Sequence, residues 1–265
     1  MTLRIATWNI NSVRLRIEQV ARFVSEAKVD VLCLQEIKCL EDQFPTNAFV
    51  DMGMPHLKVA GQKGWHGVAI ASRLPIEPSE TFQACKLGHA RCVSARIAGI
   101  DVQNFYIPAG GDEPDRELNP KFDHKMDFYE QLTRTVAAQD RSARLLMCGD
   151  FNIAPSPFDV WNHKYMSRVV SHTPLEVETL NRLQAAGGFA DVVRDRYPEP
   201  EKLASWWSYR AKDFRVSARG LRLDHIWTSP GLTPAVVSGS ATIHEPVRAW
   251  EQPSDHCPIT VDLDV

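Results

Sequence analysis

The sequence predicts an α/β fold in one domain covering residues 1–265, with mixed sheets arranged as a sandwich flanked by helices. Three observations support this. Strand-like segments and amphipathic helical segments follow one another along the whole chain. No linker-like stretch and no internal repeat divides it. A chain of 265 residues, with 44% hydrophobic and 24% charged residues, can also bury a sizeable core as one domain.

The N-terminal half contains one clear helical pattern among strands. Apolar and polar residues alternate over residues 3–8, which is typical of a strand. Apolar residues then recur at helical spacing from Ile17 to Val24, with Asn11 or Ser12 as the expected cap. A short apolar run at residues 29–34 ends in Gln35-Glu36. The further strands expected in this half cover residues 67–71, 91–97 and 102–107.

The C-terminal half continues the alternation of helices and strands. An apolar stripe from Phe122 to Val136 predicts a helix, and residues 145–148 predict a buried strand that stops at Gly149-Asp150. Thr173, followed by Pro174 and by Glu176 three residues on, has the pattern of a capping box. The last two strands are expected at about residues 223–228 and 258–263.

Composition excludes several classes of protein. The net charge of −3 argues against a protein that coats nucleic acid or an anionic membrane nonspecifically. The 17 prolines and 14 glycines are scattered, which argues against a fibrous chain. Among the six cysteines no pair has C-x-x-C spacing, and no stretch approaches the roughly 20 apolar residues of a membrane helix. We therefore expect a reduced, cytoplasmic protein without a membrane partner.

Familiar catalytic motifs are absent, but polar side chains recur where predicted strands end. The sequence has no phosphate-binding loop, dinucleotide fingerprint, zinc-protease motif or nucleophile elbow. A strand end holds a side chain rigidly while leaving it in reach of solvent, which suits a preorganised site. The polar residues at or near strand ends are Asn9, Glu36, Tyr106, Asp150, Asn152, Asp224, Asp255 and His256.

These residue types together favour metal-assisted phosphodiester hydrolysis. Oxygen atoms of Asn9, Glu36 and Asp255 are ligands that suit Mg²⁺. An Asp beside an Asn can orient and deprotonate a water, and a His paired with an Asp can stabilise charge on a phosphoryl oxygen. Taken singly, each residue has a more ordinary explanation as a turn, cap, packing or solvated residue. Those explanations become weak only because all the strand ends carry such groups.

Six segments along the chain form a recognisable series: TWNIN (7–11), LQEIK (34–38), GVAI (67–70), GDFNIA (149–154), GLRLD (220–224) and SDHCP (254–258). They resemble the exonuclease III family of apurinic/apyrimidinic (AP) endonucleases, within the endonuclease/exonuclease/phosphatase superfamily, and occur in the family's order. The resemblance implies a four-layer, DNase I-like α/β sandwich with two mixed sheets packed face to face. It also implies cleavage of DNA 5′ to abasic sites with Mg²⁺ or Mn²⁺, together with 3′-5′ exonuclease and 3′-end-cleaning activity.

The resemblance also assigns roles. It implies that Glu36 is the principal metal ligand, assisted by Asn9 and Asp255. It makes Asp150 the residue that activates the attacking water, and it pairs Asp224 with His256 at the scissile phosphate. Asn152 lies beside the water, Tyr106 lies near the phosphate, and a second metal at Asp150, Asn152 and His256 is left open. The loop at residues 108–112 departs from the family pattern, so its approach to the phosphate is not predicted.

DNA is the expected partner because basic and aromatic residues are interleaved at residues 202–222. This run has six basic residues and one acidic residue, although such runs are often only solvated surface. The resemblance implies that Trp206, Trp207 and Leu221 line a pocket for the extrahelical abasic sugar; core packing is the alternative for the tryptophans. The phosphate-contact candidates are Arg210, Lys212, Arg215, Arg219 and, on the exposed side of its helix, Lys125.

The expected protein is a monomer acting on duplex DNA with abasic sites or blocked 3′ ends. Two other readings stay open. One is a related phosphodiesterase acting on RNA or small phosphoesters, since the fold alone does not fix the substrate. The other is a non-catalytic DNA-binding adaptor, which would not need the metal and water ligands.

Overall fold

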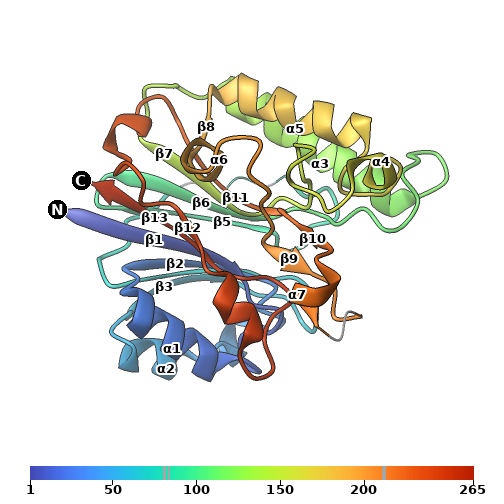
Figure 1. Ribbon diagram of the computed structural model, residues 1–265. Coiled ribbons are helices and arrows are strands. Elements are labelled where there is room, and N and C mark those ends of the chain that lie inside the picture. The colour runs from blue at the N-terminus through green and yellow to red at the C-terminus, as the bar shows by residue number, and fades with distance from the viewer. Residues whose placement is uncertain (80–81, 83, 211–212) are drawn as a thin grey trace.

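The computed structural model describes residues 1–79, 82, 84–210 and 213–265, and it has four layers (Figure 1). Two large mixed sheets pack face to face, and helices cover the outer face of each. The predicted sandwich is therefore confirmed. Both termini lie at one end of the sheets, where the Met1 amino group donates to the Val265 carbonyl.

The first sheet has six strands, with α1 (Ile17–Ala27) and α2 (Thr46–Asp51) on its outer face. β1 pairs with β2 in parallel, and the other pairings are antiparallel. Two 3-10 helices, η1 (Glu41–Gln43) and η3 (Glu245–Ala249), lie in its connections. In spatial order the strands are β12 (Thr242–Ile243), β13 (Ile259–Asp264), β1 (Thr2–Asn9), β2 (Val31–Gln35), β4 (Val68–Ser72) and β3 (His56–Ala60).

The second sheet has five strands beneath α3 (Pro120–Ala137) and α5 (Pro174–Gly187). β6 pairs with β7 in parallel. In spatial order the strands are β5 (Cys92–Ile97), β6 (Ile100–Tyr106), β7 (Leu145–Asp150), β11 (Asp224–Thr228) and β8 (Ala190–Asp191). The shorter elements around it are α4 (His163–Met166), α6 (Val192–Arg196) and η2 (Thr233–Ala235).

A two-stranded ribbon lies at the end of the sandwich opposite the termini (Figure 1). β9 (Trp206–Trp207) pairs antiparallel with β10 (Gly220–Leu221), and α7 (Phe214–Ser217) lies between them in the chain. The aromatic and basic run of the sequence therefore forms a structure of its own at this end.

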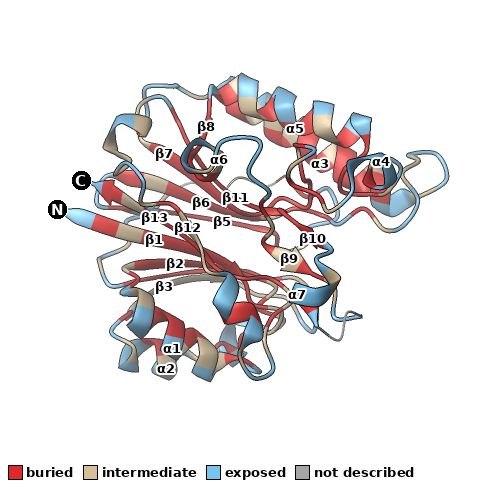
Figure 2. Cartoon of the chain, in the orientation of Figure 1, coloured by how far each residue is buried: buried red, intermediate tan, exposed pale blue. Residues whose placement is uncertain are grey.

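Both faces of the central strands are buried, as Figure 2 shows. In β2, Val31 and Cys33 belong to the core between the sheets, whereas Leu32 and Leu34 pack on the helix side. Successive side chains of a strand point to opposite faces, so a continuous apolar run satisfies both layers at once. This explains why the strand was recognisable as an unbroken apolar stretch.

One helix start differs from the prediction. The capping box at Thr173 and Glu176 is confirmed. The prediction that Asn11 or Ser12 caps α1 is wrong, because the N-cap is Arg16, whose side chain makes no capping bond. The Asn11 side chain instead donates to Asp255 at 2.9 Å. A polar interaction at the strand end therefore takes the residue that sequence alone would place on the helix.

Two further observations bear on the environment of the chain. No helix among the described residues is long and apolar enough to cross a membrane. All six cysteines are buried free thiols.

Candidate active site

The strand ends converge on one edge of the sandwich, and sheet topology explains why. β1 and β2 are parallel, so Asn9 and Glu36 follow at the same end. β6 and β7 are also parallel and bring Tyr106 and Asp150 to register partners. β11 and β13 run antiparallel to their neighbours, so the starts of these strands, not their ends, reach this edge. Asp224 is consequently the register partner of Asp150.

Asn9 joins the two sheets at this edge. Its side-chain amide donates to Glu36 Oε1 and to Asp150 Oδ2, both at 3.0 Å. Its backbone carbonyl accepts from the Ser254 hydroxyl at 2.6 Å. Asn9 is fully buried, so its geometry is fixed by these partners and not by solvent. The structure thus brings the predicted residues Asn9, Glu36 and Asp150 together.

His256 is held by Asp224 and faces Asp150. Its Nδ1 lies 2.8 Å from Asp224 Oδ2, and its Nε2 lies 3.7 Å from Asp150 Oδ2. Burial opposes a charge on this ring, but Asp224 and Asp150 outweigh it and raise the pKa of His256 to about 10. The imidazole is therefore protonated at neutral pH and can donate toward an anion beside Asp150. The predicted pairing of Asp224 with His256 is present in the structure.

Ser205 completes this pair, and the sequence did not single it out. The Ser205 hydroxyl donates to Asp224 Oδ2 at 2.6 Å. The Ser205 oxygen in turn accepts from the backbone N–H groups of Leu223 and Asp224, each at 3.0 Å. Asp224 Oδ1 is buried with no hydrogen-bond partner among the described residues. The only available signal was its place immediately before Trp206-Trp207.

The two carboxylates nearest the sheet junction have opposite pKa shifts. Burial raises the pKa of Asp150 to about 7, which suits a group that takes a proton from water near neutral pH. Burial would also raise the pKa of Glu36, but Lys38 and Asn9 outweigh it and lower that pKa. Lys38 Nζ lies 2.9 Å from Glu36 Oε2. Glu36 is therefore kept ionised, while Asp150 is poised to change its protonation state.

Asp255 is held on the other side of the site. Its Oδ1 accepts from Asn11 and its Oδ2 accepts from Trp206 Nε1, at 2.9 and 3.0 Å. Burial opposes its charge, but His256, Asn11 and Trp206 outweigh this and lower the pKa of Asp255. Asn11 and Lys38 are thus two positioning residues that lie inside recognised motifs without having been assigned a role.

The donor set fits a divalent cation. Ligand atoms of Asp150, Asp224 and His256 all lie within 4.8 Å of one another, and the free Asp224 oxygen is an orphaned buried acceptor. The carboxylates of Glu36 and Asp255 line the same cavity, and Asn9 contacts Glu36 through its amide nitrogen while its amide oxygen accepts from the Asn11 backbone. Such hard oxygen ligands suit small divalent cations. The sequence left open a second metal at Asp150, Asn152 and His256. Two of these residues, Asp150 and His256, belong to the cluster, and the Asn152 backbone N–H donates to Asp150 Oδ1 at 3.0 Å.

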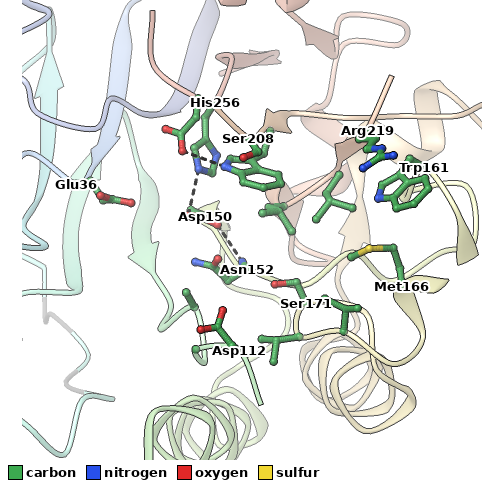
Figure 3. Close-up of a pocket in the computed structure, with 18 of the residues that line it drawn as sticks. Glu36, Asp112, Asp150, Asn152, Trp161, Met166, Ser171, Ser208, Arg219 and His256 are labelled. Carbon is green, nitrogen blue, oxygen red and sulfur yellow. Dashed lines mark hydrogen bonds and ion pairs between the residues drawn. The ribbon is translucent and has the colours of Figure 1, made fainter. Parts of the chain in front are cut away.

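The site opens into a cavity of about 690 Å³ with two unlike walls (Figure 3). One wall carries the polar groups, including Glu36, Asp150 and His256, and Tyr106 also lines it. Burial, reinforced by Glu36 and Asp150, raises the pKa of Tyr106 well above its usual value, so its hydroxyl keeps its proton. Asp112, from the loop that departs from the family pattern, also lines the cavity. The apolar wall consists of Trp161, Met166, Trp206, Leu221 and Leu223.

The two adjacent tryptophans face opposite sides of the ribbon. Trp206 lines the cavity and packs with Leu221 and Leu223. Trp207 is 6% exposed and packs edge-on against Phe214, with ring centroids 5.2 Å apart. Neighbouring side chains of a strand alternate in direction, so only one of the two can face the cavity. The expectation that Trp207 lines this pocket is wrong, and core packing accounts for it.

The basic candidates also divide between surface and interior. Arg219 is exposed at the cavity rim, with its guanidinium over the Trp161 ring at 5.0 Å. Arg210 and Arg215 are exposed, and Lys212 lies outside the described residues. Arg222 was counted in the basic run, but it is 1% exposed and bonds both Asp159 and Asp191. It therefore adds no charge to the surface of this run.

The sequence-based prediction that Lys125 lies on the exposed side of its helix is wrong. Its side chain is fully buried, and Nζ lies 2.5 Å from Glu176 Oε1 and 2.7 Å from the Asn152 carbonyl. Its ammonium group ties α3 to the start of α5 and to the loop that follows β7. A direct contact with DNA phosphate is excluded by this burial.

A comparison with protein-family models now places the chain. The model of the Endonuclease/Exonuclease/phosphatase family matches residues 6–256. The chain belongs to this family. The match includes every strand end of the site, from Asn9 to His256, which agrees with the resemblance seen in the sequence.

Individual family members are similar over their full length. Exodeoxyribonuclease III of Haemophilus influenzae is 32% identical, with 98% of this chain and 100% of the relative covered. An AP endonuclease structure from Archaeoglobus fulgidus is 32% identical with a TM-score of 0.89, covering 99% and 100% of the two chains. The 3′ phosphatase NExo from Neisseria, bound to a product DNA hairpin, is 31% identical with a TM-score of 0.90 and the same coverage. The predicted relationship to exonuclease III and AP endonucleases is confirmed.

Proposed function

We propose that this protein is a divalent-metal-dependent DNA repair nuclease that hydrolyses the phosphodiester 5′ to abasic sites and also processes 3′ ends. One observation carries the proposal: the Asn9–Glu36–Asp150 contact and the Asp224–His256 pair share a cavity whose other wall is apolar. The polar wall suits phosphoryl chemistry, and the apolar wall suits a nucleotide that lacks its base. The names of the related nucleases support DNA as the substrate.

The metal of this proposal is Mg²⁺, with Mn²⁺ as a substitute. Glu36, Asn9 and Asp255 would hold it; a second ion at Asp150, Asn152 and His256 would require the His256 ring to lose its proton. When bound, such an ion supplies charge neutralisation on the scissile phosphate and lowers the pKa of a coordinated water. The chain itself supplies orientation. Asp150 accepts the proton of the attacking water, and Asn152 is anchored beside it through the Ile107 carbonyl at 2.9 Å.

His256 and Tyr106 act on the phosphate in this proposal. The protonated imidazole, oriented by Asp224, donates to a non-bridging oxygen and stabilises the charge that develops in the transition state. The Tyr106 hydroxyl, which keeps its proton, is a second donor from the end of β6. Because both groups are fixed before substrate arrives, little reorganisation is needed during the reaction.

The apolar wall selects a nucleotide without a base. An abasic sugar leaves the duplex without breaking a base pair, so its extrusion is cheap. Trp206, Leu221 and Leu223 offer it an apolar surface next to Asp255. Arg219 lies at the cavity rim, Arg210 and Arg215 are exposed nearby in the chain, and all three would contact phosphates of the flanking duplex. We further propose a cytoplasmic monomer; the six free thiols are compatible with a reducing compartment.

The direct test is a nuclease assay on matched substrates. Purified protein with Mg²⁺ is expected to cut a duplex 5′ to a tetrahydrofuran abasic analogue and to release 3′ phosphate from a blocked end. EDTA should abolish both activities. RNA of the same sequence and phospholipid head groups are the comparison substrates. Absence of cutting on the DNA substrates with either metal, or faster cleavage of RNA, would contradict the proposal.

The tryptophan pair provides a specificity test. Trp206→Ala is expected to lower the rate of abasic cutting roughly 10- to 100-fold, because it removes apolar surface that would pack against the base-less sugar, and a lost contact in a hydrophobic pocket costs about 1–3 kcal/mol. The rate on undamaged 3′ ends should fall less. Trp206→Phe keeps the ring but loses the N–H bonded to Asp255, and so separates the two contributions. Trp207→Ala should instead lower the unfolding free energy by about 3–5 kcal/mol. Equal losses on both substrates for Trp206→Ala would contradict a selective role.

A further inference from the structure

A second cluster of ligand-type side chains lies outside the catalytic edge. It consists of Cys85, His89 and His124, whose ligand atoms all lie within 4.8 Å of one another. Cys85 and His89 belong to the segment that leads into β5, and His124 lies on α3. None of the three takes part in the chemistry proposed above. Their types, one sulfur and two imidazole nitrogens, differ from the oxygen ligands of the catalytic edge.

The side chains of the cluster lie close together and are largely shielded from solvent. Cys85 Sγ and His124 Nε2 are 3.3 Å apart, and these residues are only 9% and 6% exposed. The rings of His89 and His124 meet edge-on, with centroids 5.8 Å apart. His89 Nδ1 is buried and has no hydrogen-bond partner among the described residues. A buried ring nitrogen without a partner is costly, and coordination to an ion would satisfy it.

Charge around the cluster decides which ions it would accept. Arg91 and Lys86 are the positive neighbours, while Asp123 and Asp127 contact Lys86. A hard ion such as Mg²⁺, which relies on carboxylate oxygens, gains little here. A thiolate adds negative charge of its own and bonds strongly to Zn²⁺, whose usual ligands are Cys and His.

We propose that Cys85, His89 and His124 form a binding site for a thiophilic transition-metal ion, Zn²⁺ being the best match, separate from the catalytic divalent-cation site. Three protein ligands leave the fourth tetrahedral position to water or to a neighbouring side chain. His66 is one such neighbour, because its ring stacks on that of His89 with centroids 4.8 Å apart.

Occupancy of this site would join parts of the chain that are distant in sequence. The ion ties the segment before β5 to α3, across 35 or more residues. His66 stacks on His89 on one side and contacts Tyr106 on the other, with ring centroids 5.8 Å apart. The cluster therefore adjoins the polar wall of the catalytic cavity through one ring. The three ligands are brought together only in the folded chain, so a bound ion should also raise the unfolding temperature.

The test uses Co²⁺ as a spectroscopic substitute for Zn²⁺. The full chain is titrated with Co²⁺ in the presence of excess Mg²⁺, which occupies the oxygen ligands of the catalytic edge. We expect a thiolate-to-Co²⁺ charge-transfer band in the near ultraviolet that saturates at one ion per chain and is bleached by Zn²⁺. Co²⁺ at the catalytic edge gives no such band because no cysteine is among the described residues that line the cavity. A titration without the band would overturn the proposal.

Variants assign the ligands. Cys85→Ser should abolish the band, whereas Cys92→Ser, a change of a neighbouring buried thiol, should leave it intact. His89→Asn alters a half-exposed side chain and so tests the site without emptying the core. It should weaken Zn²⁺ binding by more than the roughly 10- to 100-fold typical of losing an outer-shell partner. A band that persists in Cys85→Ser, or unchanged Zn²⁺ affinity in His89→Asn, would overturn the assignment.

Discussion

Asp150→Asn is expected to lower the rate of abasic-site cleavage by about 10²- to 10⁴-fold, the range associated with loss of a general base. The variant keeps the shape of the side chain, including an oxygen that can accept from the Asn152 backbone. It loses the group that takes the proton from water. Single-turnover cleavage of a tetrahydrofuran duplex at saturating Mg²⁺ measures this change directly.

The stability of the Asp150→Asn variant should not fall with its activity. The folded environment raises the pKa of Asp150 to about 7, so stability falls as the pH rises above the ordinary pKa of a carboxyl group, and the loss is complete above about pH 7. A neutral amide removes this cost, and the unfolding temperature in EDTA should be equal to or higher than that of the natural protein. Asp112→Asn is the matched control, since Asp112 lines the same cavity from an exposed loop. An equal loss of activity in that control would contradict the role assigned to Asp150.

The strand ends were the predictable part of the site. An apolar run buried on both faces is visible in sequence, and its polar terminus marks the edge of a sheet. The sequence alone does not tell which edges coincide. That depends on pairing: β1 with β2 and β6 with β7 are parallel, whereas β11 and β13 run the other way. The order of the motifs supplied the missing information, because it matched a family whose topology is known.

Side-chain direction was the unpredictable part. Trp206 and Trp207 have the same composition signal, and only the register of the short β9–β10 ribbon decides which one faces the cavity. Lys125 and Arg222 appeared to be surface cations because charged residues are rarely fully buried. Their partners, Glu176, Asp159 and Asp191, lie far away in sequence, so no local pattern identifies the pairs. Likewise β3 was not predicted: it is an edge strand of only five residues, all of them half-buried.

The second large effect is expected at Lys125. Lys125→Met should lower the unfolding free energy by about 3–5 kcal/mol, because removing one partner leaves the other charge buried and unpaired. Glu176 would keep its bonds from Ser171 and Thr173 but lose the only ammonium group that contacts it among the described residues. The Asn152 carbonyl would also lose a donor. Urea unfolding monitored by circular dichroism measures the change.

Two companion variants decide whether the buried pair is the cause. Lys125→Met with Glu176→Gln removes both charges and should recover part of the lost stability, since replacing a whole buried pair is often tolerated. Arg182→Met breaks the exposed Glu178–Arg182 pair on α5, and it should cost only about 0.3–0.5 kcal/mol, as for other helical surface pairs. Suppose instead that Lys125→Met weakened DNA binding but unfolded at the same urea concentration as the unsubstituted protein. Lys125 would then be a phosphate contact. Full burial of the Lys125 side chain argues for a loss of stability. Any loss of activity would then follow from displacement of Asn152.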